Sequence, residues 1–527
     1  MKKIPLTFIV LFCMNFGICA QTLDNNTRTW DESSENELAN IRYNSKNPVR
    51  LSYNALRTFG VAVVDYGLRR GDFHAPETSG KVNDLNVYIA GLQNVGKFDV
   101  SGYIRYINQQ QRDKRWNSTL GLRWDNPLIL ADTINSQQSV EQFDMNATGA
   151  FQINDSWKLG LSISLQTGTL SDQTDPRPET QFSNLPITVG AEYRLTDKFS
   201  LGLNTGVRLF SSEINHHIED PQKNYVYYLM RGNGDYYRRS SADVSGYSRE
   251  YKGTSYNGAV QLNYQFSDKI SDLLEFGIDA GHENATDEGG ILFKGGDYDF
   301  TEFAVSNRII IKNSDVLLHN IIFSANIDKG EVNWYDQRKV LDTEHGNRTY
   351  YLTLGKYKAH ENNYIKASAE YRIDFLKKGK QDMFLDFRTG IRNFNNKQFN
   401  TNIDIQKATN INFLLAAGKK CQFKKVNLNT SVYAGYSFAT GDDFTDGSSY
   451  ANENIAVEYT LPYYQFEISK RYDIGAKVDF GMPLSKQIYG GAFITVDSHI
   501  YADNGKYINV YKGTSFTTTK LGLYLKF

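Results

Sequence analysis

The chain has 527 residues, a formal net charge of −1 and a mean hydropathy of −0.50. The near-zero charge gives no electrostatic basis for binding nucleic acid, and beyond the first twenty residues no apolar run approaches the ~20 residues that a membrane-spanning helix requires. With 35 Tyr, 31 Phe and 42 Gly but only 10 Pro, the composition is typical of membrane β-barrels with aromatic girdles and also of large secreted β-proteins.

Residues 1–20 have the pattern of a secretory signal peptide. The charged pair Lys2-Lys3 precedes the largely apolar, uncharged stretch 4–19, and Ala20 is followed by polar residues. This pattern predicts export across the inner membrane and cleavage after Ala20. Two of the three cysteines lie in this segment, so Cys421 remains alone and the exported fold has to be held by its sheet instead of by disulfides.

Residues 21–57 are polar and weakly helical, and they predict an N-terminal periplasmic tail or a small plug ahead of a barrel at 58–527. The segment is too short for the folded plug domain of a TonB-dependent transporter. The sequence therefore argues against an energised importer that acts alone.

From Thr58 onward, alternate residues are apolar over long runs. Residues 158–166 read KLGLSISLQ, and the same alternation recurs at 199–209, 255–266, 365–375, 426–438 and 472–480. Alternate residues of a strand face opposite sides, and each run has about the 9–11 residues that a tilted membrane-crossing strand needs. The pattern favours a barrel over a soluble sandwich, whose strands are shorter.

The last seven residues, LGLYLKF, form a clean example of this alternation. One face carries Leu521, Leu523, Leu525 and Phe527. A soluble protein seldom exposes such an edge strand, whereas in a closed barrel the final strand pairs with the first and its apolar face meets outer-membrane lipid. The ending is also similar to the C-terminal signal that the Gram-negative barrel-assembly machinery recognises, and this resemblance implies that machinery as a partner.

The connections between the runs alternate in length. Short turns are predicted near 94–97, 154–157, 196–198, 267–270, 312–315, 377–380, 418–424 and 482–486, and long polar loops at 110–138, 168–184, 212–254, 329–360 and 439–460. Short periplasmic turns and long extracellular loops are typical of outer-membrane barrels. With a first strand near 58–70 and a last strand at 515–527, the pattern predicts an all-β, closed antiparallel transmembrane β-barrel of about 18 strands, in a range of roughly 14 to 20.

The inward faces of the later strands are predicted to carry charges of both signs. These lumen-facing residues are Lys366, Glu370, Arg372, Asp374, Asp386, Arg388, Arg392, Arg471, Asp473, Lys477 and Asp479. They could form cross-strand pairs that stiffen the wall, set the selectivity of a pore, or pair with an inserted loop. The pattern favours a wall of mixed charge without preference for anions or cations, around a lumen wide enough for water unless it is plugged.

The loop 212–254 is unusually rich in tyrosine and arginine. Its candidate binding residues are Tyr225, Tyr227, Tyr228, Tyr236, Tyr237, Arg238 and Arg239. Rigid aromatic rings and forked donors among small polar residues are typical of binding surfaces, here for a glycan, a peptide or a partner protein. The alternative is an aromatic belt with a solvated loop that packs on itself.

Neither metal binding nor catalysis is predicted. The stretch 442–453 matches four positions of a calcium loop, but Phe444 stands where an oxygen ligand belongs and the flanking segments are strands. The adjacent His216 and His217 are a weak metal pattern. No GxSxG, HExxH or P-loop motif is present, so the sequence predicts no cofactor and no enzyme.

The chain resembles a family of uncharacterised outer-membrane β-barrels from Bacteroidota. The resemblance rests on the Asn-, Lys- and Tyr-rich strands, on residues 64–74, VDYGLRRGDFH, and on the terminal 521–527. It implies location in the outer membrane of a Gram-negative cell and carries no settled activity. Members are similar to accessory proteins found beside larger nutrient-uptake receptors.

Two functions stay open at this point. A passive channel or uptake porin for small solutes requires a continuous water path through the lumen. An accessory binding or scaffold barrel in an envelope complex would have a closed lumen, and its partner would be another outer-membrane receptor or a lipoprotein.

Overall fold

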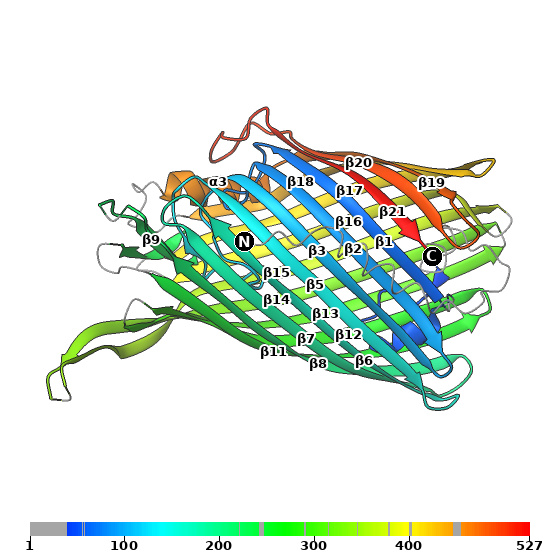
Figure 1. Ribbon diagram of the computed structural model, residues 1–527, viewed down its shortest axis with the longest axis horizontal. Helices are drawn as coiled ribbons and strands as arrows, with labels where there is room; N and C mark the ends of the chain where they lie inside the picture. Colours follow the sequence, from blue (N-terminus) through cyan, green and yellow to red (C-terminus); the bar gives the residue numbers. More distant parts are fainter. Residues whose placement is uncertain are drawn as a thin grey trace.

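In the described part of the chain, eighteen strands join edge to edge in one antiparallel sheet that closes on itself (Figure 1). This computed structural model describes residues 39–54, 56, 58–220, 222–241, 247–288, 291–314, 316–344, 346–377, 380–399, 403–445 and 455–527. The expected signal peptide, the first part of the expected tail and most of the calcium-like stretch lie outside the described residues. The predicted all-β, closed barrel of about 18 strands is confirmed.

The barrel strands form two runs along the chain, separated by part of a small second sheet. The first run is β1 (Thr58–Gly71), β2 (Lys81–Val95), β3 (Phe98–Lys114), β5 (Ser136–Gln152), β6 (Trp157–Asp172), β7 (Pro178–Arg194) and β8 (Phe199–His216). The second run is β11 (Ser248–Ser267), β12 (Ile270–Glu288), β13 (Leu292–Ser314), β14 (Leu317–Asp342), β15 (Arg348–Lys377), β16 (Lys380–Phe399), β17 (Ile403–Phe423), β18 (Val426–Thr445), β19 (Arg471–Pro483), β20 (Tyr489–Tyr501) and β21 (Ser515–Lys526).

The other elements lie in the N-terminal segment and in the connections. They are the 3-10 helix η2 (Pro48–Tyr53), the π-helix η3 (Ala456–Thr460), helix α3 (Leu461–Ile468) and the small sheet of β4 (Leu130–Ala131), β9 (Val226–Gly232) and β10 (Asp235–Ser240). None of the helices in the described ranges is long and apolar enough to cross a membrane.

The barrel closes between its first and last strands. β1 pairs with β2 on one side and with β21 on the other, so that Val61 lies opposite Lys526. Beyond this register the backbone of Phe527 exchanges two hydrogen bonds with Gly60, at 2.7 and 3.0 Å. Each strand of a closed sheet has two neighbours, so the described strands leave no unpaired edge for another chain to join.

The outer surface of the barrel is apolar because alternate side chains point away from the lumen. In β21, Leu521 and Leu523 are 61% and 65% exposed, whereas Tyr524 between Leu523 and Leu525 is 3% exposed. In β8, Leu203 is 59% exposed and its neighbour Asn204 only 3%. An apolar outer belt around a polar interior is the arrangement of a barrel that crosses a lipid bilayer.

Two segments predicted as long loops are strands. Apart from one short turn in each, residues 168–184 belong to β6 and β7, and residues 329–360 belong to β14 and β15. Both strand pairs continue beyond the lipid belt, where outward residues no longer meet lipid and the apolar alternation stops. The turn predicted at 418–424 lies later, at 424–425.

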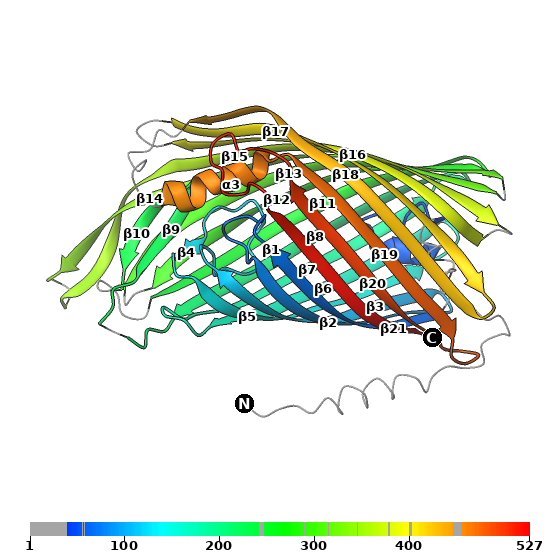
Figure 2. The ribbon, with the colours of Figure 1, turned by 90° about the horizontal axis from the view of Figure 1, so that it is seen from above.

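The two ends of the barrel differ, and we refer to them as the turn end and the loop end. Short turns gather at the turn end, where the C-terminus also lies. The loop end holds the small sheet and α3, which lie within the ring of strands (Figure 2). The hairpin of β14 and β15 projects beyond the ring at this end, at the lower left of Figure 1.

Candidate lumenal site

A short N-terminal segment, residues 40–54, lies inside the turn end of the barrel (Figure 2). The Asn47 side chain accepts a hydrogen bond from the backbone N–H of Val49 at 3.1 Å, and Pro48 begins η2. An Asn cap followed by proline favours the start of a helix at this point. The helical turn packs against inward residues of β3, β5, β6 and β7.

The main anchor of the N-terminal segment is an ion pair with β7. Arg42 donates to the two carboxylate oxygens of Glu192 at 2.9 and 3.1 Å and stacks over the ring of Tyr53, whose hydroxyl donates to the same carboxylate. The Glu192 side chain is 8% exposed. Paired hydrogen bonds between a guanidinium and a carboxylate are among the stronger contacts in proteins, so this contact fixes the position of the segment.

Hydrogen bonds to three further strands complete the attachment. Ser45 donates to Glu275 of β12 at 2.7 Å, and Asn47 donates to Gln261 of β11 at 3.0 Å. On β13, Arg308 donates to the backbone carbonyl of Asn40 at 3.0 Å. Apolar side chains contribute as well: Ile41 joins a small apolar cluster of the wall, and Val49 and Leu51 are buried, so polar and apolar groups together hold the segment across a broad arc of the wall.

A folded cap occupies the loop end, and we define it as the described residues of 115–135, 217–241 and 455–469. β4 from the first part pairs with β9 from the second, with Leu130 opposite Leu229. These two leucines, Leu128 and Tyr227 are each at most 1% exposed and belong to one core with aromatic and aliphatic side chains of β7, β8 and β11–β15. The cap is therefore a packed apolar body and is continuous with the wall.

Trp116 joins the three parts of the cap. It is fully buried in a cluster with Met230, Tyr236 and Ile455. Its backbone has a φ of 69°, a conformation that bulky residues rarely adopt, and its N–H donates to the carbonyl of Asp132 at 3.0 Å. Burial of the large ring offsets the cost of this conformation and holds the three parts together.

Arg123 connects residues 115–135 of the cap to the wall strands β13 and β14. Its guanidinium lies 2.7 Å from Asp125 and 3.2 Å from each of Glu302 on β13 and Asp328 on β14. The Asp125 and Asp328 side chains are 0% and 2% exposed. Buried carboxylates that share one cation depend on that cation for their stability in the folded protein.

Next to this cluster, Trp124 is exposed toward the lumen. Its ring is 54% exposed, with the Lys366 ammonium 3.5 Å from its centre and the ring of Tyr364 edge-on at 4.8 Å. The Lys366 ammonium also lies 3.3 Å from Asp328. The underside of the cap is therefore polar and charged, in contrast to its apolar core.

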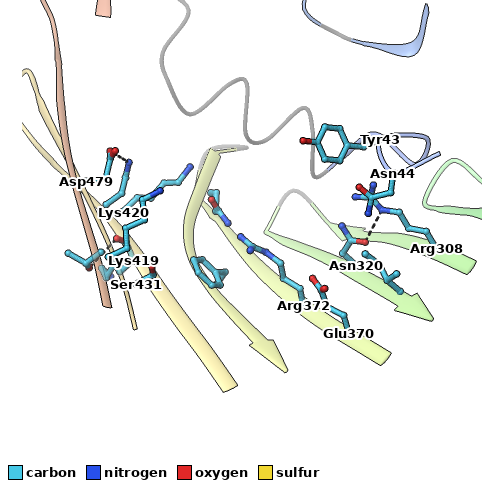
Figure 3. A pocket seen from close by; sticks show the side chains of 16 residues that line it. Tyr43, Asn44, Arg308, Asn320, Glu370, Arg372, Lys419, Lys420, Ser431 and Asp479 are labelled. Atoms are coloured by element: carbon cyan, nitrogen blue, oxygen red, sulfur yellow. Dashed lines mark hydrogen bonds between the residues drawn. The ribbon is translucent and has the colours of Figure 1, made fainter. Parts of the chain in front are cut away.

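A cavity of about 420 Å³ lies at the turn end between the N-terminal segment and the strands β13 to β19 (Figure 3). Tyr43 and Asn44 of the segment form one side. The basic lining residues are Arg308, Arg372, Lys419, Lys420 and Lys477, and the acidic ones are Glu370 and Asp479. More basic than acidic side chains line the cavity, and two of the basic ones have acidic partners just outside the lining: Arg372 donates to Asp374, and Lys419 lies 3.7 Å from Asp382.

Some of the predicted lumenal charges pair with each other along a single strand. Arg372 donates to Asp374 at 2.9 Å, and Arg388 donates to Asp386 at 2.6 Å. Residues two apart share one face of a strand, so these contacts run along the strand instead of across it. One contact between neighbouring strands joins Arg388 to Glu370 at 3.5 Å.

The remaining members of the set meet other parts of the barrel. Arg392 pairs with Glu467 of α3, which brings the cap into contact with the wall. Asp473 lies 2.5 Å from a ring nitrogen of His499 and 3.5 Å from Arg471. Asp479 accepts hydrogen bonds from Asn429 and Tyr524 at 3.1 and 3.2 Å, and Lys477 lines the cavity.

The tyrosine- and arginine-rich loop folds into the cap. Tyr227 is fully buried and stacks on Tyr247, with 5.0 Å between the ring centres. The other members range from buried to exposed: Tyr225 and Tyr236 are buried, Tyr228 and Arg239 are half-buried, and Tyr237 and Arg238 are exposed. The packing corresponds to the alternative of a loop that packs on itself, and a binding role for its exposed members stays a prediction.

Two buried histidines belong to wall strands, His216 to β8 and His360 to β15, and the ring of His216 contacts Tyr227 of the cap at 4.7 Å between ring centres. The ring of His216 donates to the carbonyl of Tyr247 at 3.1 Å, and that of His360 donates to Gln398 at 3.0 Å. Burial lowers the pKa of each imidazole to about 4, because the charged form is disfavoured away from water. Within the described ranges, no three His, Cys, Asp or Glu side chains come together to hold a metal ion.

The sequence analysis missed the residues that attach the N-terminal segment and the cap to the wall. Arg42 and Glu192 are 150 positions apart, Arg123 and Asp328 are 205 apart, and such pairings leave no local pattern. A signal was available in 123–126, Arg-Trp-Asp-Asn, where charged and aromatic residues adjoin inside a predicted loop.

Comparison with known proteins gives the family. No curated protein matches the chain in sequence. Solved structures that resemble it include the RagAB peptide transporter (6% identity, TM-score 0.42, covering 89% of this chain and 86% of that one), the FrpB iron transporter from Neisseria meningitidis (F3-3 variant; 10%, 0.40, 90% and 83%) and the copper transporter OprC (8%, 0.40, 88% and 81%). The model described as Family of unknown function (DUF6850) matches residues 48–527, and the chain belongs to this family.

Proposed function

We propose that this protein is a barrel of the Gram-negative outer membrane that works with its lumen closed, as an accessory binding or scaffold subunit of an envelope complex. Because short turns are periplasmic and long loops extracellular in such barrels, the turn end faces the periplasm and the loop end faces the exterior. The observation that supports the proposal is that folded chain occupies both ends of the lumen, the cap at one and the N-terminal segment at the other.

The cap resists opening because its core would have to meet water. Leu128, Leu130 and Leu229 are each at most 1% exposed, and burial of one such side chain contributes roughly 1.5–3 kcal/mol. All three belong to one cluster with the wall, so they would have to leave it together. The cap therefore differs from a loop that narrows a passive channel, because such a loop leaves an open path for solutes beside it.

Contacts with the wall also surround the cap. Asn362 of β15 donates to the carbonyl of Asp125 at 2.6 Å. Farther round the barrel, Asn233 donates to the carbonyl of Asn396 at 3.2 Å, and Gln398 of β16 donates to Asp235 at 2.7 Å. A cap fastened on several strands supports a closed lumen over a freely open one.

A gated channel for small solutes is the second candidate, and one observation favours it. The lumen at the turn end holds a cavity of about 420 Å³ with charged walls. Protein interiors are normally close-packed, so this unfilled space leaves room for a solute. Such a channel would need the N-terminal segment to leave the lumen and the cap to shift.

Co-purification tests the scaffold proposal. Protein carrying an affinity tag is expressed at its native level, cross-linked in intact cells and purified from the envelope fraction. The proposal expects a defined outer-membrane receptor or lipoprotein to be recovered with it, in constant ratio. Recovery strictly as a monomer, with cross-linking shown to work on a known complex in the same cells, contradicts it.

Planar-bilayer recordings separate the two candidates. The scaffold proposal expects the purified wild-type barrel to show no steady conductance. A gated channel instead predicts openings once the N-terminal segment is released, as in a Glu192→Gln variant that loses the ion pair with Arg42.

A further inference from the structure

Two neighbouring turns at the turn end form a surface rich in lysine. One joins β15 to β16 and the other joins β17 to β18, and their exposed lysines are Lys377, Lys380, Lys424 and Lys425, which we call the lysine surface. We propose that the lysine surface binds the acidic segment 21–38 of the same chain. The inference goes beyond the closed-lumen proposal, since binding at this surface does not depend on whether the barrel conducts.

Few carboxylates accompany these lysines. The stretches 376–382 and 419–426, which hold both turns, contain seven lysines and one acidic residue, Asp382. Asp382 lies 3.7 Å from Lys419, which is not one of the four. Within the described ranges, no carboxylate forms an ion pair with any lysine of the lysine surface. Like charges held close together repel each other, so an acidic partner is favoured there.

The segment 21–38 has the complementary charge. Its charged residues are five acidic ones and one arginine, namely Asp24, Arg28, Asp31, Glu32, Glu35 and Glu37. Because an exposed ion pair contributes little on its own, binding requires several such pairs at once. Five carboxylates within fourteen positions of the chain supply them.

The described chain starts beside the lysine surface. The side chain of Ile41 belongs to an apolar cluster that Leu376 of β15 packs against, and Leu376 is the residue before Lys377. Arg308 of β13 donates to the carbonyl of Asn40 at 3.0 Å, which fixes the chain where it meets the wall. The acidic segment therefore joins the described chain next to the turn between β15 and β16.

This short linkage raises the local concentration of acidic groups. A chain advances at most ~3.6 Å per residue, so the backbone of Glu37 lies within about 11 Å of that of Asn40. A group tethered so closely has an effective concentration of roughly millimolar order, and a free acidic peptide has to exceed that concentration to compete. The tether favours the chain's own segment over a separate acidic protein.

Binding at the lysine surface adds a second attachment for the N-terminal segment. Residues 40–54 are held inside the barrel by contacts such as those of Arg42 with Glu192 and of Ser45 with Glu275, whereas the acidic segment is held at the rim. Contacts between exposed charges are screened by salt. Raised ionic strength should therefore release the acidic segment before the lumenal contacts yield.

Cleavage after Arg28 by an arginine-specific protease tests the proposal on the full-length protein, with the released N-terminal peptide measured by mass spectrometry. Cleavage requires the chain around Arg28 to leave the lysine surface. The rate should rise about ten-fold when several weak ion pairs are lost together, in the quadruple variant Lys377→Gln, Lys380→Gln, Lys424→Gln and Lys425→Gln. Raising the NaCl concentration should accelerate cleavage of the wild type in the same way.

The matched control removes four exposed lysines from other turns of the same end, as Lys97→Gln, Lys198→Gln, Lys269→Gln and Lys486→Gln. It changes the net charge by the same amount and should leave the cleavage rate at the wild-type value. A circular dichroism spectrum of each variant establishes that its barrel is intact. Equal acceleration in the two quadruple variants overturns the proposal.

Carbodiimide cross-linking identifies what occupies the lysine surface, because it joins carboxylates to amines that are in contact. Wild-type protein labelled with heavy nitrogen is mixed with unlabelled protein, in detergent and in nanodiscs of phosphatidylethanolamine and phosphatidylglycerol. The expected products join Glu35 or Glu37 to the lysine surface within one copy, in both media. The proposal is overturned if no product joins 21–38 to the lysine surface, if the products join labelled to unlabelled copies, or if they form in detergent but not in nanodiscs. The last two results would assign the surface to a second copy or to phospholipid.

Discussion

The cap and the N-terminal segment occupy opposite ends of one lumen and are held there by different chemistry. The cap buries an apolar core, with Trp116 fully enclosed where its three parts meet. The N-terminal segment buries fewer apolar side chains, among them Val49 and Leu51, and depends as well on hydrogen bonds and on the ion pair of Arg42 with Glu192. Opening an apolar core exposes it to water at full cost, whereas polar contacts exchange for water at a smaller net cost. The turn end is therefore the weaker of the two closures.

Replacement of Trp116 by alanine should have the largest effect on this contrast. The change removes a fully buried ring from the cap junction, and large-to-small substitutions of this kind cost about 3–5 kcal/mol. The cap should become sensitive to limited proteolysis, and the urea midpoint for its opening should fall. Trp124→Ala is the matched control, because this ring lies in the same part of the cap and is 54% exposed; equal sensitivity in the two variants would contradict the account.

Arg123→Met should have the next largest effect. Asp125 and Asp328 would lose their shared cation while still buried, and breaking a buried ion pair costs about 3–5 kcal/mol, less whatever Lys366 restores at Asp328. Proteolysis within 115–135 measures the loss. Arg115→Met is the control, since its pair with Glu458 is about 40% exposed on both sides and such pairs contribute roughly 0–1 kcal/mol.

Protonation of two buried histidines should weaken the cap in acid, against the opposite effect of Asp132, whose pKa burial raises to about 6. The pKa values of His216 and His360 are lowered to about 4 from the usual 6.5, so the stability that the neutral rings contribute is complete above pH 6.5. This stability is lost progressively as pH falls toward 4, because the two rings bind protons more readily once opening of the cap exposes them to water. Thermal unfolding of the cap between pH 4 and pH 7.5 measures this slope. His216→Phe keeps an aromatic ring against Tyr227 and should make the slope shallower; an unchanged slope would exclude His216 as a contributor.

At the turn end, Glu192→Gln should have the smallest of these effects. The variant keeps the shape of the side chain and removes the charge that Arg42 and Tyr53 contact. Release of the N-terminal segment should become roughly ten-fold more frequent, equivalent to about 1.4 kcal/mol. A cysteine that replaces buried Leu51, in a Cys421→Ser background, reports release through its rate of maleimide labelling.

The control for that variant lies on the adjacent strand. Glu213→Gln in β8 alters an exposed carboxylate that accepts a hydrogen bond from Asn215, two residues away on the same strand. Labelling at position 51 should not change in this variant. If both variants accelerate labelling to the same extent, the ion pair of Arg42 with Glu192 is not what holds the segment.

The barrel itself could be predicted from sequence because lipid imposes a strict rule on each crossing strand. Leu521, Leu523 and Leu525 alternate with small or polar residues, and that period of two marks the face that meets hydrocarbon. Where a strand extends beyond the lipid-facing belt, its outward residues need not be apolar, so the alternation stops. Residues 329–342 and 348–360 therefore looked like a loop, although they are strands.

The site could be predicted only in part. Glu370, Arg372, Lys477 and Asp479 were assigned to the lumen from the alternation of their strands, and all four line the cavity. Arg308 and Lys420 were missed, because their place in the cavity depends on which strands face each other across the lumen and on the N-terminal segment. The fold of the cap could not be read from sequence either, since its core joins segments as distant as Trp116 and Ile455.

Conductance in planar bilayers tests the central claim most directly, using four forms of the protein. These are the wild type, a form without residues 40–54, a form in which 226–240 is replaced by a Gly-Ser linker, and the form with both changes. The account predicts no steady conductance in the wild type or without the N-terminal segment, and the largest conductance when both closures are removed. A steady conductance in the wild type, or a full opening after loss of the N-terminal segment alone, would contradict closure by the cap.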